Sequence, residues 1–271
     1  MKKLSIVSVC ILAVLIILYS TTSKDDKNAY VSEKTPIAEG EEVVKTTENE
    51  EAPVPAVMPE HVGKFNPQTI PATDRTIYAY GFYYEPLSDE IKDKITGVSF
   101  HENNNITYDD LRYLNVLYVD FDGNTQKGEL ICNKAIAQDL VEIFKELYDN
   151  EYQIDKIRLI DEYGGDDDLS CDDNNTSCFN YRVVGGTDSL SKHALGLAID
   201  INPFQNPYIT YPNGIERISP AGSEPYADRD SGLEHMILEG DLCYNLFTEH
   251  GFTWGGHWKT LKDYQHFQKT L

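Results

Sequence analysis

Two short stretches of the sequence combine residue types that could bind a metal ion. The first holds His193 and Asp200, seven residues apart, and the second holds Asp263 and His266, three residues apart. The first spacing is too long for one helical turn, but a loop leading into a strand could bring both side chains to one ion. Two histidines and one carboxylate are a common ligand set for catalytic Zn²⁺, with the fourth position left for water. Taken singly, a histidine here also fits a structural role, and Asp200 could cap a turn.

The residues around these stretches predict elements that would position them. Residues 198–202 alternate apolar and polar side chains, which is typical of a short strand and suits a central position in a sheet. A helix is expected from about Gly240 to His250, and Gly251 can adopt the left-handed conformation that ends it. Residues 252–254 predict another strand.

The first half of the region expected to fold shows both the two-residue periodicity of strands and the 3.6-residue periodicity of helices. Apolar residues between 117 and 121 alternate with more polar ones before Gly123-Asn124, which predicts a strand entering a hairpin. Between residues 136 and 147 apolar side chains recur on one helical face, and Asn150 lies near the end of this predicted helix. Residues 157–160 predict a further strand. This order predicts an α+β domain around a small antiparallel sheet flanked by helices.

Three separate motifs resemble those of a known family. His193 to Asp200 reads H-x-x-G-x-A-x-D, Asp263 to Phe267 reads D-x-x-H-F, and Trp254 to Trp258 reads W-G-G-H-W. In this order they are similar to the motifs of VanY-type D-Ala-D-Ala carboxypeptidases and the related L-Ala-D-Glu endopeptidases. The similarity extends from about residue 179 to residue 267. It implies the LAS or hedgehog-like zinc peptidase fold.

The resemblance also implies roles for five residues. His193, Asp200 and His266 would bind Zn²⁺, and Asp263 would be the general base that takes a proton from the metal-bound water. Arg182 would stabilise the oxyanion that forms on the substrate carbonyl, although a surface ion pair is the alternative in so acidic a protein. The implied activity is zinc-dependent hydrolysis of peptidoglycan stem peptides, either by removing a terminal D-Ala or by cutting between L-Ala and D-Glu.

Other features of the sequence leave alternatives open. His257 stands where family members usually carry an acidic residue, so it could contact substrate or be structural. Many relatives use Glu where this chain has Asp263. Tyr208 and Tyr211 could border the cleft, because they follow Asp200 closely. A catalytically inactive, zinc-containing cell-wall binding module is the alternative function, but a purely structural site would need neither Asp263 nor Arg182. A serine or cysteine hydrolase is a third possibility, but the chain has no G-x-S-x-G motif and no cysteine close to a motif histidine.

Charge and hydropathy define the remaining parts of the chain. A net charge of −22 argues against nucleic-acid binding. Lys2 and Lys3 precede an apolar run from Leu4 to Tyr19, which predicts a signal peptide or N-terminal membrane anchor over residues 1–23. Residues 24–63, rich in Glu, Thr and Pro, predict a disordered acidic linker, and residues 64–271 the zinc peptidase domain. The chain is therefore expected at the extracellular face of the cell envelope, secreted or anchored by its N-terminal segment.

The cysteines suggest one disulfide. Outside the apolar run, which contains Cys10, the chain has Cys132, Cys171, Cys178 and Cys243. Cys171 and Cys178 flank a short polar segment that is expected to be an exposed loop, so they form the favoured pair in an oxidising compartment. Free thiols are the alternative.

Overall fold

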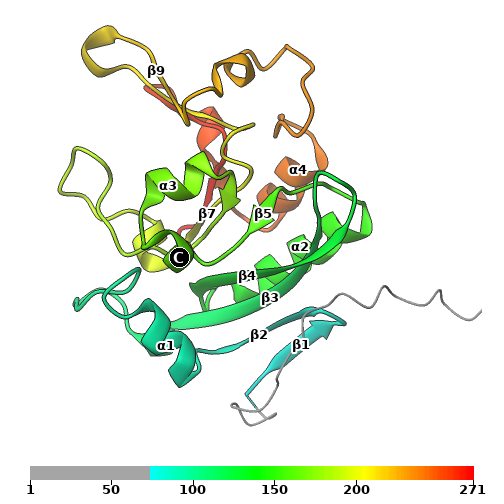
Figure 1. The fold of residues 1–271 in the computed structure, drawn as a ribbon, viewed down its shortest axis with the longest axis vertical. Helices are drawn as coiled ribbons and strands as arrows, with labels where there is room; N and C mark the ends of the chain where they lie inside the picture. The colour runs from blue at the N-terminus through cyan, green and yellow to red at the C-terminus, as the bar shows by residue number, and fades with distance from the viewer. Residues whose placement is uncertain (1–73) are drawn as a thin grey trace, which may run out of the picture. The chain divides into compact units, whose positions relative to one another are not determined.

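The computed structural model describes residues 74–271 (Figure 1). The segments predicted as signal peptide or anchor, 1–23, and as linker, 24–63, lie outside the described residues. Within residues 74–271 no helix is both long enough and apolar enough to cross a membrane. The helices are α1 (Asp89–Ile95), α2 (Ala137–Asp149), α3 (Asp167–Asp172) and α4 (Leu242–Glu249). The strands are β1 (Thr76–Ala79), β2 (Phe82–Pro86), β3 (Leu111–Val119), β4 (Thr125–Asn133), β5 (Lys156–Ile157), β6 (Asn175–Thr176), β7 (Ala198–Asp200), β8 (Tyr208–Thr210), β9 (Arg217–Ser219), β10 (Thr253–Trp254), β11 (Lys262–Asp263) and β12 (His266–Gln268).

The largest sheet is antiparallel and has the order β1-β2-β3-β4. Its β3–β4 hairpin confirms the predicted turn. The Asp120 carboxylate accepts hydrogen bonds from the backbone N–H groups of Asp122, at 3.0 Å, and Asn124, at 2.8 Å. Gly123 supplies the φ of +80° that the turn requires and that other residues adopt only with strain.

Both faces of this sheet are covered. On one face the buried side chains of α2, among them Leu140 and Phe144, pack in one cluster with Leu114 and Val116 of β3. On the other face, Leu111 and Tyr113 of β3 cluster with apolar residues of α1 and of the segment after β6. Each fully buried side chain of this size contributes about 1.5–3 kcal/mol to folding. The predicted helix over residues 136–147 is therefore confirmed, and Asn150, expected near its end, is the C-cap.

Three small sheets complete an α+β fold, as predicted: β10-β12-β7 and β11-β8-β9 are antiparallel, and β5-β6 is parallel. The helix expected from Gly240 begins at Leu242, because the Asp241 carboxylate caps it by accepting from the N–H of Tyr244 at 2.7 Å. Phe247 of α4 stacks on Phe267 of β12, with ring centroids 4.4 Å apart, and so fixes the helix against the sheet. The strand predicted over residues 157–160 is shorter, Lys156–Ile157.

The expected disulfide between Cys171 and Cys178 is wrong. All four cysteines in the described part of the chain are free. The segment between the pair was expected to be an exposed loop, but it contains β6, whose Asn175 and Thr176 are fully buried. Cys178 lies in the main hydrophobic core, whereas the Cys171 sulfur lies 4.0 Å from the Gln265 amide nitrogen. Polar composition was misleading because asparagine side chains can take the place of backbone partners inside a protein.

Candidate metal centre

Asp200 and His266 are brought together by strand pairing. β7 and β12 are antiparallel neighbours in which Asp200 lies directly opposite His266. Side chains at opposed positions of such a pair lie on the same face of the sheet and are close enough to share a ligand. The Asp200 Oδ1 and His266 Nδ1 atoms are 2.9 Å apart. Ser177 pairs with Asp200 on its other side through two backbone hydrogen bonds, so the strand end is fixed from both sides.

His193 reaches the same place from a short 3-10 turn, His193–Leu195, that precedes β7. The turn ends at Gly196, whose φ of +64° is left-handed. A Cβ on Gly196 would lie 2.6 Å from the backbone nitrogen of Asn133, so the motif requires glycine for two reasons. The imidazole Nδ1–H of His193 donates to the Cys178 carbonyl oxygen at 2.6 Å, which turns Nε2 toward Asp200 and His266.

These atoms fit a divalent cation. His193 Nε2 lies 3.1 Å from His266 Nδ1 and 3.2 Å from Asp200 Oδ2. Zinc–nitrogen bonds of about 2.0–2.1 Å in a tetrahedral site place neighbouring ligand atoms about 3.3 Å apart. The outer nitrogen of each ring has an acceptor, Cys178 O for His193 and Gln268 Oε1, at 3.1 Å, for His266. In the neutral rings both inner nitrogens therefore carry lone pairs that converge with a carboxylate, and a cation satisfies all of them at once.

Electrostatics favour a cation at the same point. All three residues are buried, with His193 and Asp200 each 3% exposed and His266 6% exposed. Burial opposes ionisation of Asp200, but His193 and His266 outweigh it and hold the pKa of this carboxyl well below its ordinary value. Burial likewise opposes protonation of His193, yet Asp200 more than compensates and raises its pKa. A buried carboxylate that stays ionised needs a positive partner, which a divalent ion would supply.

Asp263 is a buried carboxylate beside the three-residue group. It lies on β11, opposite Tyr208 of β8, and is 9% exposed. Its Oδ1 atom is buried and has no hydrogen-bond partner in the described structure. Burial raises the pKa of Asp263 to about 7, His266 opposes this shift, and Asp200 adds to it. Gly255 allows the close approach of Asp263, because a Cβ at residue 255 would lie 2.5 Å from the Asp263 carbonyl oxygen and 2.8 Å from the Asp263 Cβ.

Arg182 lies on the segment that runs beside the histidine turn. Its carbonyl oxygen accepts from the N–H of Ser191 at 3.1 Å, two residues before His193. Its guanidinium Nη2 pairs with Asp167 Oδ2 at 2.6 Å, and its buried Nε has no partner in the described structure. The charge of Arg182 acts on the pKa values of both His193 and Asp263, so the guanidinium lies near the group. Arg182 therefore forms an ion pair close to the grouped residues, and its role toward a substrate stays a prediction.

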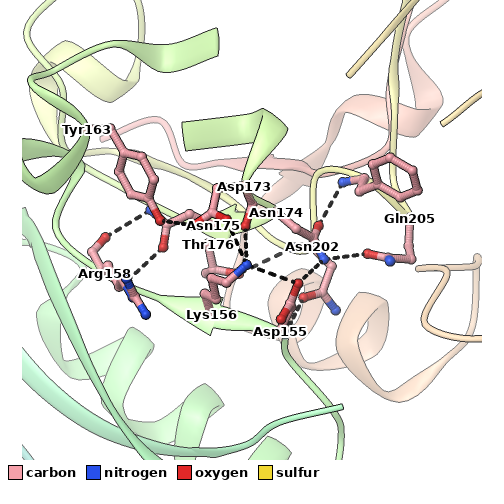
Figure 2. Close-up of polar contacts among 11 residues, drawn as sticks. Asp155, Lys156, Arg158, Tyr163, Asp173, Asn174, Asn175, Thr176, Asn202 and Gln205 are labelled. Atoms are coloured by element: carbon pink, nitrogen blue, oxygen red, sulfur yellow. Dashed lines mark hydrogen bonds and ion pairs between the residues drawn. The ribbon is translucent and has the colours of Figure 1, made fainter. Parts of the chain in front are cut away.

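Side-chain amides of Asn174 and Asn175 form a network of hydrogen bonds that holds the segment leading to Arg182 (Figure 2). Asn175 exchanges two hydrogen bonds with the backbone of Arg158 and donates to the Ser170 hydroxyl on α3. Asn174 donates to Asp155 and Gln205 and accepts from the N–H of Phe204. The network therefore joins α3, the segment leading to Arg182 and the loop after β7. Neither this network nor the role of Asp167 follows from the sequence, since no local pattern marks these contacts.

The remaining candidates lie around the group rather than in it. His257 Nε2 lies 3.4 Å from a Glu239 carboxylate oxygen, and its ring packs against Tyr244 and Trp254. These contacts favour the structural alternative for His257. The ring of Trp258 in the same motif lies 5.2 Å from that of His266, so this tryptophan is the motif side chain that reaches the site. Tyr208 is half-buried opposite Asp263, whereas Tyr211 is exposed.

Comparison with known proteins supports the motif-based resemblance. The profile of a family described as D-alanyl-D-alanine carboxypeptidase matches residues 185–269. No curated protein and no solved structure matches the chain significantly. The matched residues include the three grouped side chains and Asp263, whereas Arg182 and Asp167 precede them. The resemblance to the VanY-type D-Ala-D-Ala carboxypeptidase family is thus confirmed over residues 185–269.

Proposed function

We propose that this chain is a zinc-dependent hydrolase of peptide bonds in peptidoglycan stem peptides. One observation carries the proposal. Among the residues that the structure describes, His193, Asp200 and His266 are buried with ligand atoms within 4.8 Å of one another, and Asp263, whose buried Oδ1 atom has no hydrogen-bond partner, lies beside them. A structural metal site would not need that extra carboxylate. The family match supports a peptidase, and the N-terminal apolar run supports action outside the cytoplasmic membrane.

Each residue has a separate task in the proposed reaction. When bound by His193, Asp200 and His266, Zn²⁺ would lower the pKa of a water molecule and polarise the substrate carbonyl. Asp263 would accept a proton from the attacking water and return it to the leaving amine. Arg182 would donate hydrogen bonds to the carbonyl oxygen as this atom gains negative charge.

Digestion of defined muropeptides tests the proposal. The purified full chain is incubated with a disaccharide pentapeptide whose stem contains both the L-Ala–D-Glu and the D-Ala–D-Ala bonds, and the products are identified by mass spectrometry. We expect hydrolysis that stops on chelation and returns with Zn²⁺. The description of the matching family favours release of the terminal D-Ala. Products cut after L-Ala would assign the endopeptidase activity instead.

The same experiment distinguishes the alternative function. A zinc-containing binding module would retain the pentapeptide without releasing any product. Binding with no hydrolysis over a range of pH and zinc concentrations would therefore contradict the peptidase proposal.

A further inference from the structure

We infer that Asp167 is the positioning residue that holds the Arg182 guanidinium in place for its task at the carbonyl oxygen. This inference rests on the proposed function. It concerns a residue that lies before the region matched by the family profile, and it starts from the 2.6 Å ion pair between Asp167 Oδ2 and Arg182 Nη2.

Arg182 needs such a partner because of its surroundings. An unrestrained arginine side chain has many rotamers, and fixing them costs up to about 2 kcal/mol. Two other carboxylates of the described residues, those of Asp200 and Asp263, lie in the same region. The charges of Arg182 and Asp200 both act on the pKa of Asp263, and both also act on the pKa of Asp167. Pairing with Asp263 would weaken the base, and pairing with Asp200 would compete with the cation. Asp167 provides a third carboxylate that has neither of these tasks.

The pairing leaves the guanidinium able to act. Arginine has five N–H donors in a planar fork, and the contact with Asp167 uses Nη2. The side chains of Arg182 and Asp167 are 28% and 32% exposed, so the pair is partly screened from water but still reachable by a substrate. A bound carbonyl oxygen could therefore receive hydrogen bonds from donors that Asp167 does not use.

The contacts of α3 place Asp167 next to Arg182. Asp167 is the first residue of the helix, and Asp166 caps that end by accepting from the N–H of Leu169 at 3.1 Å. Ser170, one turn later, is buried and accepts from the Asn175 amide at 3.0 Å. Asn175 belongs to the segment that continues to Arg182, so one buried hydrogen bond between side chains links α3 to that segment. This is the arrangement expected of a side chain that orients another.

Asp168 offers a matched control. It lies beside Asp167 in the first turn of α3 and contributes the same charge near the helix N-terminus, but it is exposed and has no partner among the described residues. Any effect of charge on the helix alone would appear in both Asp168→Ala and Asp167→Ala. An effect that passes through Arg182 would appear only in the second.

Steady-state hydrolysis of the pentapeptide muropeptide by the full chain tests the inference. We expect Asp167→Ala to lower kcat by about 10–100-fold with unchanged zinc content and a nearly unchanged KM, as for other residues that orient catalytic groups. Asp167→Asn should lose less, because its amide oxygen can still accept from Nη2. Asp168→Ala should resemble wild type. In an Arg182→Ala background, Asp167→Ala should cause no further loss, since the two act as one unit.

The possible outcomes distinguish failure of this inference from failure of the proposed function on which it rests. Wild-type protein that hydrolyses no muropeptide would overturn the proposed function and the inference together. If wild type is active, the inference alone fails when Asp167→Ala behaves like Asp168→Ala. It fails equally if the Asp167 and Arg182 effects multiply, or if Asp167→Ala raises kcat, which would show that Asp167 competes with substrate for the guanidinium.

Discussion

The two sides of the site are built by different means. On the metal side, His193, Asp200 and His266 are fixed by a glycine-terminated turn and one pair of adjacent strands, all within residues 193–268. On the other side, Arg182 pairs with Asp167 of the short helix α3, and the segment before Arg182 makes amide contacts that extend to Gln205. His193, Asp200 and His266 are thus positioned by backbone conformation and strand pairing, whereas Arg182 is positioned by contacts between side chains. Substitution of His193 or His266 should therefore remove the metal, whereas substitution of Arg182 should lower kcat and leave the metal bound.

The largest effect short of removing a ligand is expected at Asp263. Asp263→Asn keeps the size of the side chain but cannot accept a proton, so kcat should fall by roughly 10²–10⁴ while the metal stays bound. Assays of hydrolysis and of zinc content, with Asp168→Asn as the control, check this. If the variant loses its metal, Asp263 is a ligand, and the division between ligands and base is wrong.

The next effect is expected at Arg182. Arg182→Ala should reduce kcat by roughly 10²–10³, as does the loss of one oxyanion donor in other hydrolases, and should leave zinc content intact. Arg217→Ala, which removes an exposed cation from β9, is the matched control. A rate equal to wild type in both variants would show that Arg182 forms only a surface ion pair and that the Arg182–Asp167 pair has no part in hydrolysis.

The pH dependence of kcat/KM should report Asp263. A general base works when deprotonated, so the rate should fall as pH drops through its pKa. That pKa is about 7 without a cation, and a nearby divalent ion would lower it toward the ordinary value of 3.8. The acid limb should therefore have its midpoint between these values and disappear from the residual activity of Asp263→Asn. A midpoint above 7, or an identical limb in the variant, would point to another group.

The smallest predicted effect concerns stability at the turn that presents His193. Gly196→Ala must adopt a left-handed φ and also meets the Asn133 nitrogen at 2.6 Å, so unfolding free energy should fall by about 2–3 kcal/mol. Gly232 also has a left-handed φ, of +70°, but nothing within 4 Å of an added Cβ. Gly232→Ala should therefore lose about 1 kcal/mol. Equal losses in denaturant titrations would show that the close approach at Gly196 has no energetic consequence.

The same contrast explains what the sequence could predict. The β3–β4 hairpin, α2 and a strand over residues 198–202 follow from local periodicity and turn residues. The structure contains all three, although the strand is shorter, Ala198–Asp200. The grouping of His193, Asp200 and His266 followed from the resemblance, and the structure brings these residues together. The sequence predicts an exposed loop where β6 lies, because no local pattern marks the residues with which Asn174 and Asn175 form their hydrogen bonds. Asp167 was missed for the same reason, since its partner lies on a different segment.

Metal content measured together with ligand removal tests the central claim most directly. The full chain is purified, and bound metal is quantified by elemental analysis for wild type, His193→Ala, His266→Ala and His101→Ala, the last altering an exposed histidine outside the group. We predict one Zn²⁺ per chain in wild type and in His101→Ala, and loss of the metal together with hydrolysis in the other two variants. Undiminished zinc in His193→Ala and His266→Ala, or no stoichiometric metal in wild type, would contradict the account.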